Sequence, residues 1–261
     1  MDCMQHPSQQ LHGNPSNSVI VSMYILMYRS ESHVTMSLQY PINVYESVLA
    51  DHRAKRIKNI ADLSYTFAWP LLIEEIKLDL PLDRSLVNVC RLRREGPDSE
   101  PPKLYTPLHQ AATGRASIEV FKELLELGAS KTLKTAQGET AYDIGVRKNL
   151  DPEILKLIEV PEEIRKRESE IKLMEEGLHK AILGRSEDLI KKSGQQLPQL
   201  AYLYEFGSFW YPIPGMYGGF NIEATDEGVE TSSWCRVVGG SGERHVIDKE
   251  GNVTLAESGF C

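Results

Sequence analysis

The chain has 261 residues, of which 25% are charged and 41% are hydrophobic, and its formal net charge is −8, from 29 basic and 37 acidic side chains. This length is sufficient for one or two domains with a hydrophobic core, and the composition is typical of a globular protein. Proteins that grip a phosphate backbone usually carry an excess of Lys and Arg, so the acidic balance argues against nucleic acid as the main partner.

The cysteines have no paired spacing, which argues against both a zinc site and a disulfide framework; they are Cys3, Cys90, Cys235 and Cys261. A reducing compartment is therefore expected, and we predict a cytoplasmic, intracellular location. The single apolar run, residues 19–28, is too short to span a bilayer, and no Lys or Arg precedes it as in a signal peptide. No membrane association is expected.

Residues 1–35 are rich in Gln, Ser, Asn and His, and we predict that they are disordered or loosely ordered. Met36 is a candidate for the native start. Two helices are predicted next, roughly Tyr45–Leu63 and Trp69–Leu78, from apolar residues at helical spacing. A basic, proline-containing segment, 86–103, then predicts an exposed connection.

The central pattern of the chain lies between Tyr105 and Gly145. Thr106 is placed to cap a helix, and Pro107 takes the first helical position, where no backbone donor is lost. A second helix follows over residues 120–127, and Gly128 is predicted to end it in a left-handed conformation. The cycle then restarts, because Thr140 lies 34 residues after Thr106.

Residues 104–145 resemble an ankyrin repeat, whose signature combines a Thr-Pro-Leu-His opening, a second helix and a Gly-Ala step. The resemblance implies a stacked helix-pair solenoid that binds other proteins without catalysis, and it implies that the histidine of the motif, here His109, bonds between repeats. It also implies contacts through the tip of the connecting finger, which would be Thr135, Ala136 and Gln137.

Weaker repeats are expected on both sides of this unit. The helices of residues 45–78 are interpreted as a degenerate opening repeat or cap, a unit starting at Thr140 continues to Val160, and Leu178-His179 echoes Leu108-His109. The predicted fold is therefore mostly α: an ankyrin-type helix-pair solenoid over residues 36–200, with a small C-terminal antiparallel β unit over residues 201–261.

The β unit is predicted from its composition, since aromatic and glycine residues concentrate after about residue 200. Short β-prone segments alternate with turn residues, and they are 219–223, 229–238, 244–248 and 253–256. The run Gly239–Gly242 is interpreted as a hairpin turn rather than a phosphate loop, because no helix and no Lys follow it.

If residues 239–242 form that turn, Arg236 lies opposite His245, and Trp234 shares their face of the sheet. Trp234, Arg236 and His245 are then a candidate ligand cluster, or alternatively a buried Trp with a satisfied His and Arg. In the same register Cys235 points to the other face, so a Cys235–His245 nucleophile and base cannot form unless a bulge intervenes.

Two functions follow from these patterns. The first is a protein–protein interaction scaffold or adaptor, built from about three to four helix pairs. It would bind a partner protein through the finger tip at Thr135, Ala136 and Gln137 and through the finger of residues 91–103. The alternative is a ligand-binding or catalytic β unit to which the repeats recruit a substrate; an effector that imitates host ankyrin proteins is a third reading. We assign no catalytic residue, no cofactor and no metal site.

Overall fold

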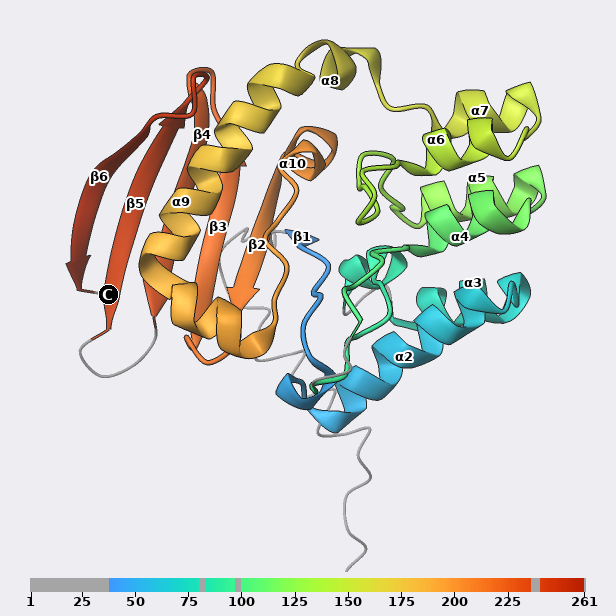
Figure 1. Cartoon of the computed structure of the whole chain (residues 1–261), viewed down its shortest axis with the longest axis horizontal. Coiled ribbons are helices and arrows are strands. Elements are labelled where there is room, and N and C mark those ends of the chain that lie inside the picture. The colour runs from blue at the N-terminus through green and yellow to red at the C-terminus, as the bar shows by residue number, and fades with distance from the viewer. Residues whose placement is uncertain (1–37, 80–82, 97–99, 236–239, 261) are drawn as a thin grey trace, which may run out of the picture. The chain divides into compact units, whose positions relative to one another are not determined.

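The computed structural model describes residues 38–79, 83–96, 100–235 and 240–260, and every statement below refers to these residues. Contacts group the described residues into one compact unit. Within this unit, helical hairpins form one part and a sheet covered by helices forms the other (Figure 1). The predicted disorder of residues 1–35 lies outside the described residues.

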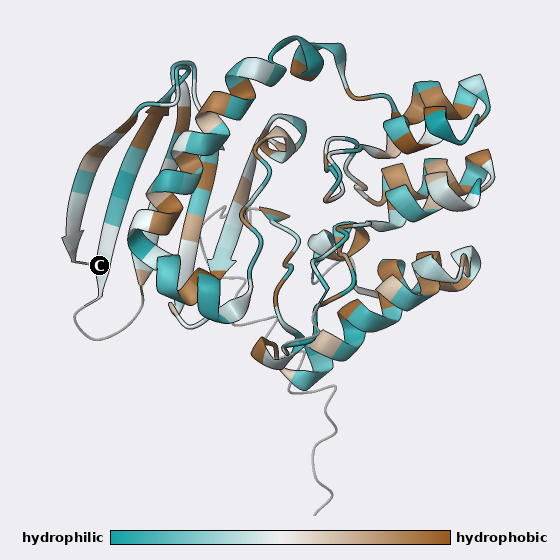
Figure 2. Cartoon of the chain, viewed as in Figure 1, coloured by the Kyte–Doolittle hydropathy of each residue, from teal (hydrophilic) through white to brown (hydrophobic). Residues whose placement is uncertain are grey.

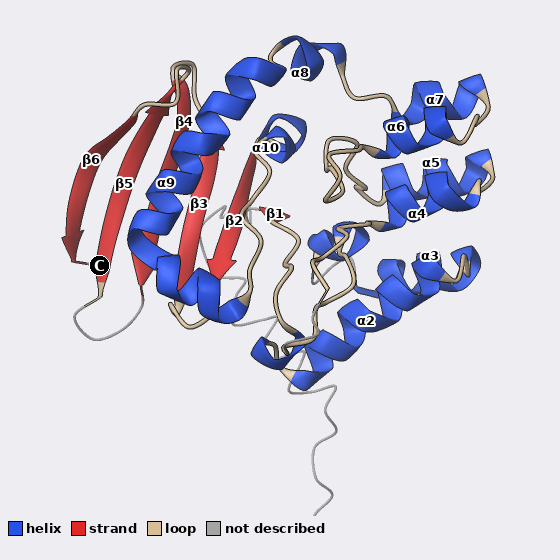
Figure 3. Ribbon diagram, in the orientation of Figure 1, coloured by secondary structure: helices blue, strands red, loops and turns tan. Residues whose placement is uncertain are grey.

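Three helical hairpins stack side by side in the first part (Figure 3). Contacts between hairpins run from α2 through α4 to α6 and from α3 through α5 to α7. The hairpins are α2 (Asp51–Tyr65) with α3 (Trp69–Asp79), α4 (Pro107–Gly114) with α5 (Ile118–Glu126), and α6 (Ala141–Arg147) with α7 (Pro152–Ile158). Two short 3-10 helices also belong to this part, η1 (Glu46–Val48) and η2 (Arg84–Asn88). Apolar faces meet in one core that includes Ile60, Ile76, Leu108, Phe121 and Ile144.

The second part is a mixed six-stranded sheet in the order β1-β2-β3-β4-β5-β6. Strand β1 is parallel to β2, and each later pair is antiparallel. The strands are β1 (Leu38–Gln39), β2 (Ser208–Ile213), β3 (Gly218–Ala224), β4 (Gly228–Cys235), β5 (Ser241–Asp248) and β6 (Val253–Phe260). Side chains of β2 alternate between half-buried and buried, which shows that one face is covered more than the other.

Helices cover one face of this sheet. The long helix α9 (Glu168–Ser193) crosses β2, β4, β5 and β6, and the short helix α10 (Ala201–Phe206) packs on β2 and β3. Helix α8 (Glu162–Lys166) precedes α9. Hydrophobic and hydrophilic residues are interspersed along α9 (Figure 2), and its buried residues include Ile171, Met174, Leu178 and Ile182. The core between helix and sheet includes Met174, Leu178, Ile182, Phe209, Phe220, Ile222 and Ile247.

This architecture overturns the predicted fold class. The described residues form nine α-helices and a six-stranded mixed sheet, which is not an ankyrin-type helix-pair solenoid with a small antiparallel unit. The segment predicted as a further repeat, around Leu178 and His179, lies in α9, which is kinked at Ser186, and Leu178 is buried against the sheet. Apolar residues every three or four positions suit burial against any apolar surface, so their period alone did not identify the surface.

Candidate protein-binding groove

The turn of residues 134–139 is held from inside by Thr135. The Thr135 amide donates to the Glu139 carbonyl at 2.8 Å, and the buried Thr135 hydroxyl accepts from the amides of Gln137 and Glu139 at 3.3 Å each. Gly138 has φ of +79°, a left-handed conformation that glycine adopts without strain. Ala136, Gln137 and Gly138 are the exposed residues of the turn, whereas Thr135 is buried and holds the turn together.

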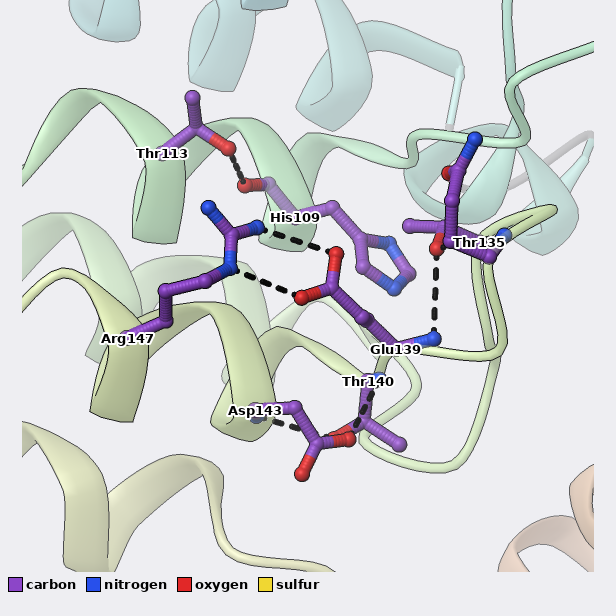
Figure 4. Close-up of polar contacts among 8 residues, drawn as sticks. His109, Thr113, Thr135, Glu139, Thr140, Asp143 and Arg147 are labelled. Atoms are coloured by element: carbon purple, nitrogen blue, oxygen red, sulfur yellow. Dashed lines mark hydrogen bonds and ion pairs between the residues drawn. The ribbon is translucent and has the colours of Figure 1, made fainter.

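Glu139 and Thr140 join this turn to α6 (Figure 4). Arg147 donates to both carboxylate oxygens of Glu139, at 2.9 and 3.0 Å. Thr140 and Asp143 form a reciprocal capping box, in which the Thr140 amide donates to Asp143 at 2.8 Å and the Thr140 hydroxyl accepts from the Asp143 amide at 3.2 Å. These bonds fix the direction in which α6 leaves the turn.

His109 extends from α4 toward the same turn (Figure 4). The Thr106 amide donates to His109 Nδ1 at 3.2 Å, which closes the capping box of α4. Burial lowers the pKa of His109 to about 4, and the nearby backbone of Glu139 and Leu133 opposes only part of that shift. The imidazole is therefore neutral at physiological pH, and its role is to stabilise the start of α4.

Helix α10 and the residues before it bind the chain just N-terminal to the turn. The carboxylate of Glu205 accepts bonds from the Ser130 hydroxyl at 2.6 Å, the Lys131 amide at 2.8 Å and the Thr132 hydroxyl at 2.9 Å. The side chain of Gln199 pairs with the backbone of Lys134 through both its oxygen and its nitrogen, at 2.7 and 2.8 Å. These polar groups of residues 130–134 are thus hydrogen-bonded within the chain and are not available to a partner.

A groove of about 780 Å³ opens beside the turn. One wall is formed by the start of α6 together with Thr132, Lys134, Thr135, Ala136 and Gly138, and the other wall comes from α8 and the first turns of α9. Its apolar lining includes Tyr142, Val160, Ile164, Ile171 and Ala201. Charged pairs border it: Lys134 bridges to Glu168 at 2.7 Å, and Arg165 pairs with Glu159 at 2.9 Å.

The predicted finger residues relate to this groove in different ways. Thr135 and Ala136 line it, while Gln137 does not. The α8–α9 wall was missed in the sequence, because residues 161–176 are dense in alternating charge, a pattern typical of a solvated helix. The two walls are also some thirty residues apart in the chain. Of the basic 91–103 finger, Arg91 pairs with Asp62 and lies over the Tyr65 ring at 4.8 Å, so it is tied to α2.

The candidate ligand cluster of the β unit is not brought together. Trp234 pairs with Gly242 and His245 with Thr231, so the two side chains lie on opposite faces of the sheet. Trp234 stacks on Trp210 with ring centroids 4.6 Å apart, whereas His245 lies on the α9 side, 3.9 Å from a Glu243 oxygen. Arg236 lies outside the described residues.

The register predicted for this hairpin was wrong, because the connection between β4 and β5 is longer than the glycine run alone. Cys235 therefore shares the α9-side face with His245, but it lies four residues along β4 from Thr231, the partner of His245. At the usual rise this is about 13 Å, too far for a nucleophile and its base. The Cys235 thiol instead donates to the Met216 carbonyl at 2.8 Å.

Among the described residues, no helix combines the length and the apolar character needed to cross a membrane. No group of three or more His, Cys, Asp or Glu side chains in the described ranges is placed to hold a metal ion.

The groove beside residues 134–139 is therefore the feature of the described chain that best suits a ligand, and its size and mixed lining fit a segment of polypeptide. No family model matches the chain, and no curated protein or solved structure was found to match it.

Proposed function

We propose that this protein is an interaction scaffold, or adaptor, that binds a partner protein by holding an extended segment of it in the groove beside residues 134–139. The observation that carries the proposal is the groove itself, about 780 Å³ with an apolar lining and a charged rim. Specific protein interfaces combine an apolar centre with a polar border in this way. The groove walls are also held by the carboxylate and amide clamps of Glu205 and Gln199, so a ligand meets a preformed site.

The polarity of the groove indicates the character of the segment. Tyr142, Val160 and Ala201 line the groove and are partly exposed, so they offer apolar surface to side chains of a partner. Ile164 and Ile171 are buried beneath this lining. The rim carries both signs of charge, at Lys134, Glu168, Arg165 and Glu159, which favours a mixed polar and apolar peptide over a polyanion. The net charge of −8 agrees with a protein partner rather than nucleic acid.

The local resemblance of residues 104–145 to an ankyrin repeat also supports a role in protein binding. It concerns the α4–α5 hairpin and the turn that follows, where Thr106 and Thr140 both cap helices through reciprocal capping boxes. The proposal includes a reducing, intracellular place of action, and its support is that the two described cysteines, Cys90 and Cys235, are free thiols.

The test compares two substitutions in one turn. Ala136→Trp places a large ring in the groove, and Gln137→Trp places the same ring on an exposed neighbour that does not line it. A partner is first identified by cross-linking and mass spectrometry with the wild-type chain, and its Kd is then measured for each variant. We expect Ala136→Trp to weaken binding by about tenfold or more, and Gln137→Trp by less than about twofold.

Equal Kd values for the two variants and the wild type would show that the partner binds elsewhere. Cross-links that map only to the sheet would do the same.

A further inference from the structure

Strand β6 is an edge of the sheet, since no other strand of the described residues pairs with its outer side. It pairs with β5 on one side and comes last in the strand order, and Figure 1 shows it at the end of the sheet with α9 crossing one face. Residues 254–259 are all exposed, in contrast to the buried positions of β2, β3 and β4. An edge strand presents a row of backbone N–H and C=O groups to any strand that can match them.

The hydrogen-bond pattern shows which β6 residues present those groups. The Asp248 amide donates to the Asn252 carbonyl at 3.1 Å, so Asp248 directs its backbone toward β6. Alternation along β5 then directs Ile247, His245, Glu243 and Ser241 away from β6. Their partners on β6 face the open edge: they are Val253, Leu255, Ser258 and Phe260.

These four positions are not evenly spaced, because a bulge opposite Arg244 and His245 inserts Ala256 into β6. Their separations are two, three and two residues. A regular partner strand presents its free groups at every second residue, so it would match this edge on only one side of the bulge. A strand with the same bulge, running antiparallel, matches it on both sides.

We propose that β6 pairs with β6 of a second copy of this chain, about a two-fold axis between Ala256 and Glu257. In this register Val253 lies opposite Phe260 of the other copy, and Leu255 lies opposite Ser258, so every outward-facing position meets another one. In any other antiparallel register, at least one of these four outward-facing residues would lie opposite a residue of the other copy that does not face outward, or opposite none. The two six-stranded sheets become one continuous sheet.

The side chains agree with this pairing. Val253, Leu255 and Ser258 lie opposite Ile247, His245 and Glu243 of β5, so they are on the α9 side of the sheet in both copies. Leu255 is 53% exposed, so it leaves apolar surface at the edge for the second copy to cover.

Charge does not oppose the pairing. Glu257 is the only charged residue of β6, and it lies opposite Ala256 of the other copy rather than opposite itself. Arg244 also neutralises it within its own chain, at 2.9 Å. The strand contains no Pro and no Lys, the residues with which many proteins block such an edge.

The test is a matched pair of substitutions at Ala256, which is exposed in the single chain. Ala256→Glu places a carboxylate opposite Glu257 of the other copy on both sides of the axis, and Ala256→Gln is the uncharged control. Sedimentation equilibrium of the full chain distinguishes 29.4 kDa from twice that mass. We expect the wild type and Ala256→Gln to dimerise, and Ala256→Glu to dissociate at least about tenfold more readily, less so in 1 M salt.

Amide hydrogen exchange of the wild type gives a second readout that needs no substitution. Leu255 and Ser258 are expected to gain protection as concentration rises, while Thr254 and Gly259, which face β5, stay protected throughout. A wild type that is monomeric at about 100 μM, an Ala256→Glu variant that dimerises as the wild type does, or Leu255 and Ser258 amides that exchange rapidly at every concentration would each overturn the proposal. A partner peptide that protects these amides in a monomer would also overturn it.

Discussion

The carboxylate of Glu205 on α10 accepts a hydrogen bond from the hydroxyl of Thr132 at 2.9 Å, across 73 residues of sequence. The same carboxylate also receives the backbone amides of Lys131 and Thr132, at 2.8 and 3.2 Å. One side chain from the sheet half thus satisfies several donors in a turn of the hairpin half. This contact, with that of Gln199, places the turn of residues 134–139 and so shapes one wall of the groove.

Glu205→Gln is expected to lower the free energy of unfolding by about 1–3 kcal/mol, because a neutral amide accepts these bonds more weakly and leaves donors unsatisfied. Chemical denaturation measures the change, and hydrogen exchange should show faster exchange at residues 130–134. Glu176→Gln is the control, since Glu176 is exposed on α9. If the two variants lose the same stability, the Glu205 contact does not hold the turn.

Two glycines of α9 give opposite predictions. A Cβ on Gly177 would lie 2.7 Å from the Gly251 carbonyl oxygen, whereas a Cβ on Gly184 would meet nothing within 4 Å. Gly177→Ala is expected to destabilise the protein by about 1–3 kcal/mol, since the helix must move away from the β5–β6 turn. Gly184→Ala is expected to stabilise it by about 0.5–1 kcal/mol through helix propensity.

Thermal or urea unfolding distinguishes the two glycine variants. Stabilisation by both substitutions would mean that α9 does not approach Gly251 so closely.

Stability is expected to depend on pH through His109. Its pKa is about 4 in the folded chain and 6.5 when exposed, so the unfolded chain binds the additional proton between these values. Stability is then full above pH 6.5 and is lost as pH falls toward 4, by up to about 3 kcal/mol. Denaturation at a series of pH values should show this loss in the wild type and not in His109→Asn.

An NMR titration of the imidazole provides the direct check on His109. Protonation with a midpoint near 6.5 would contradict its burial.

The two described thiols should differ in reactivity. Burial raises the pKa of Cys90 to about 12, so almost no thiolate is present at pH 8. Both side chains are partly exposed, but the raised pKa of Cys90 withholds its thiolate, so we expect iodoacetamide to modify Cys90 at least about a hundredfold more slowly than Cys235. Peptide mass spectrometry follows each site, and the two rates should converge in denaturant. Rapid labelling of Cys90 in the native protein would show that its thiol is open to solvent.

Local signals in the sequence predicted several elements correctly. Pro107 does begin α4 after the cap at Thr106, Trp69 begins α3, and Gly128 has the left-handed φ of +94°. All four predicted strands also overlap observed ones, namely β3, β4, β5 and β6. Helix caps, turns and strand alternation depend on residues that are close in sequence, so they can be predicted without knowledge of the tertiary structure.

Other elements depended on distant partners and were missed. Strand β1 has only two residues and exists because Leu38 and Gln39 pair with β2, 171 residues away. Strand β2 contains Pro212 beside aromatic residues, a pattern that also suits a loop. The register of β4 and β5 required the length of their connection, which the glycine run did not reveal.

The sequence by itself determined where the chain caps, turns and alternates, and it located the turn of residues 134–139 beside which the groove lies. Only the tertiary structure decided that α9 covers a sheet instead of continuing a stack of hairpins, and that α8 and α9 complete the groove. The physical reason is that the hydrophobic effect is non-directional, so the apolar spacing of α9 predicts burial against some apolar surface without specifying which one. The surface that buries α9 is the sheet, which pairs residues more than 160 positions apart in the chain.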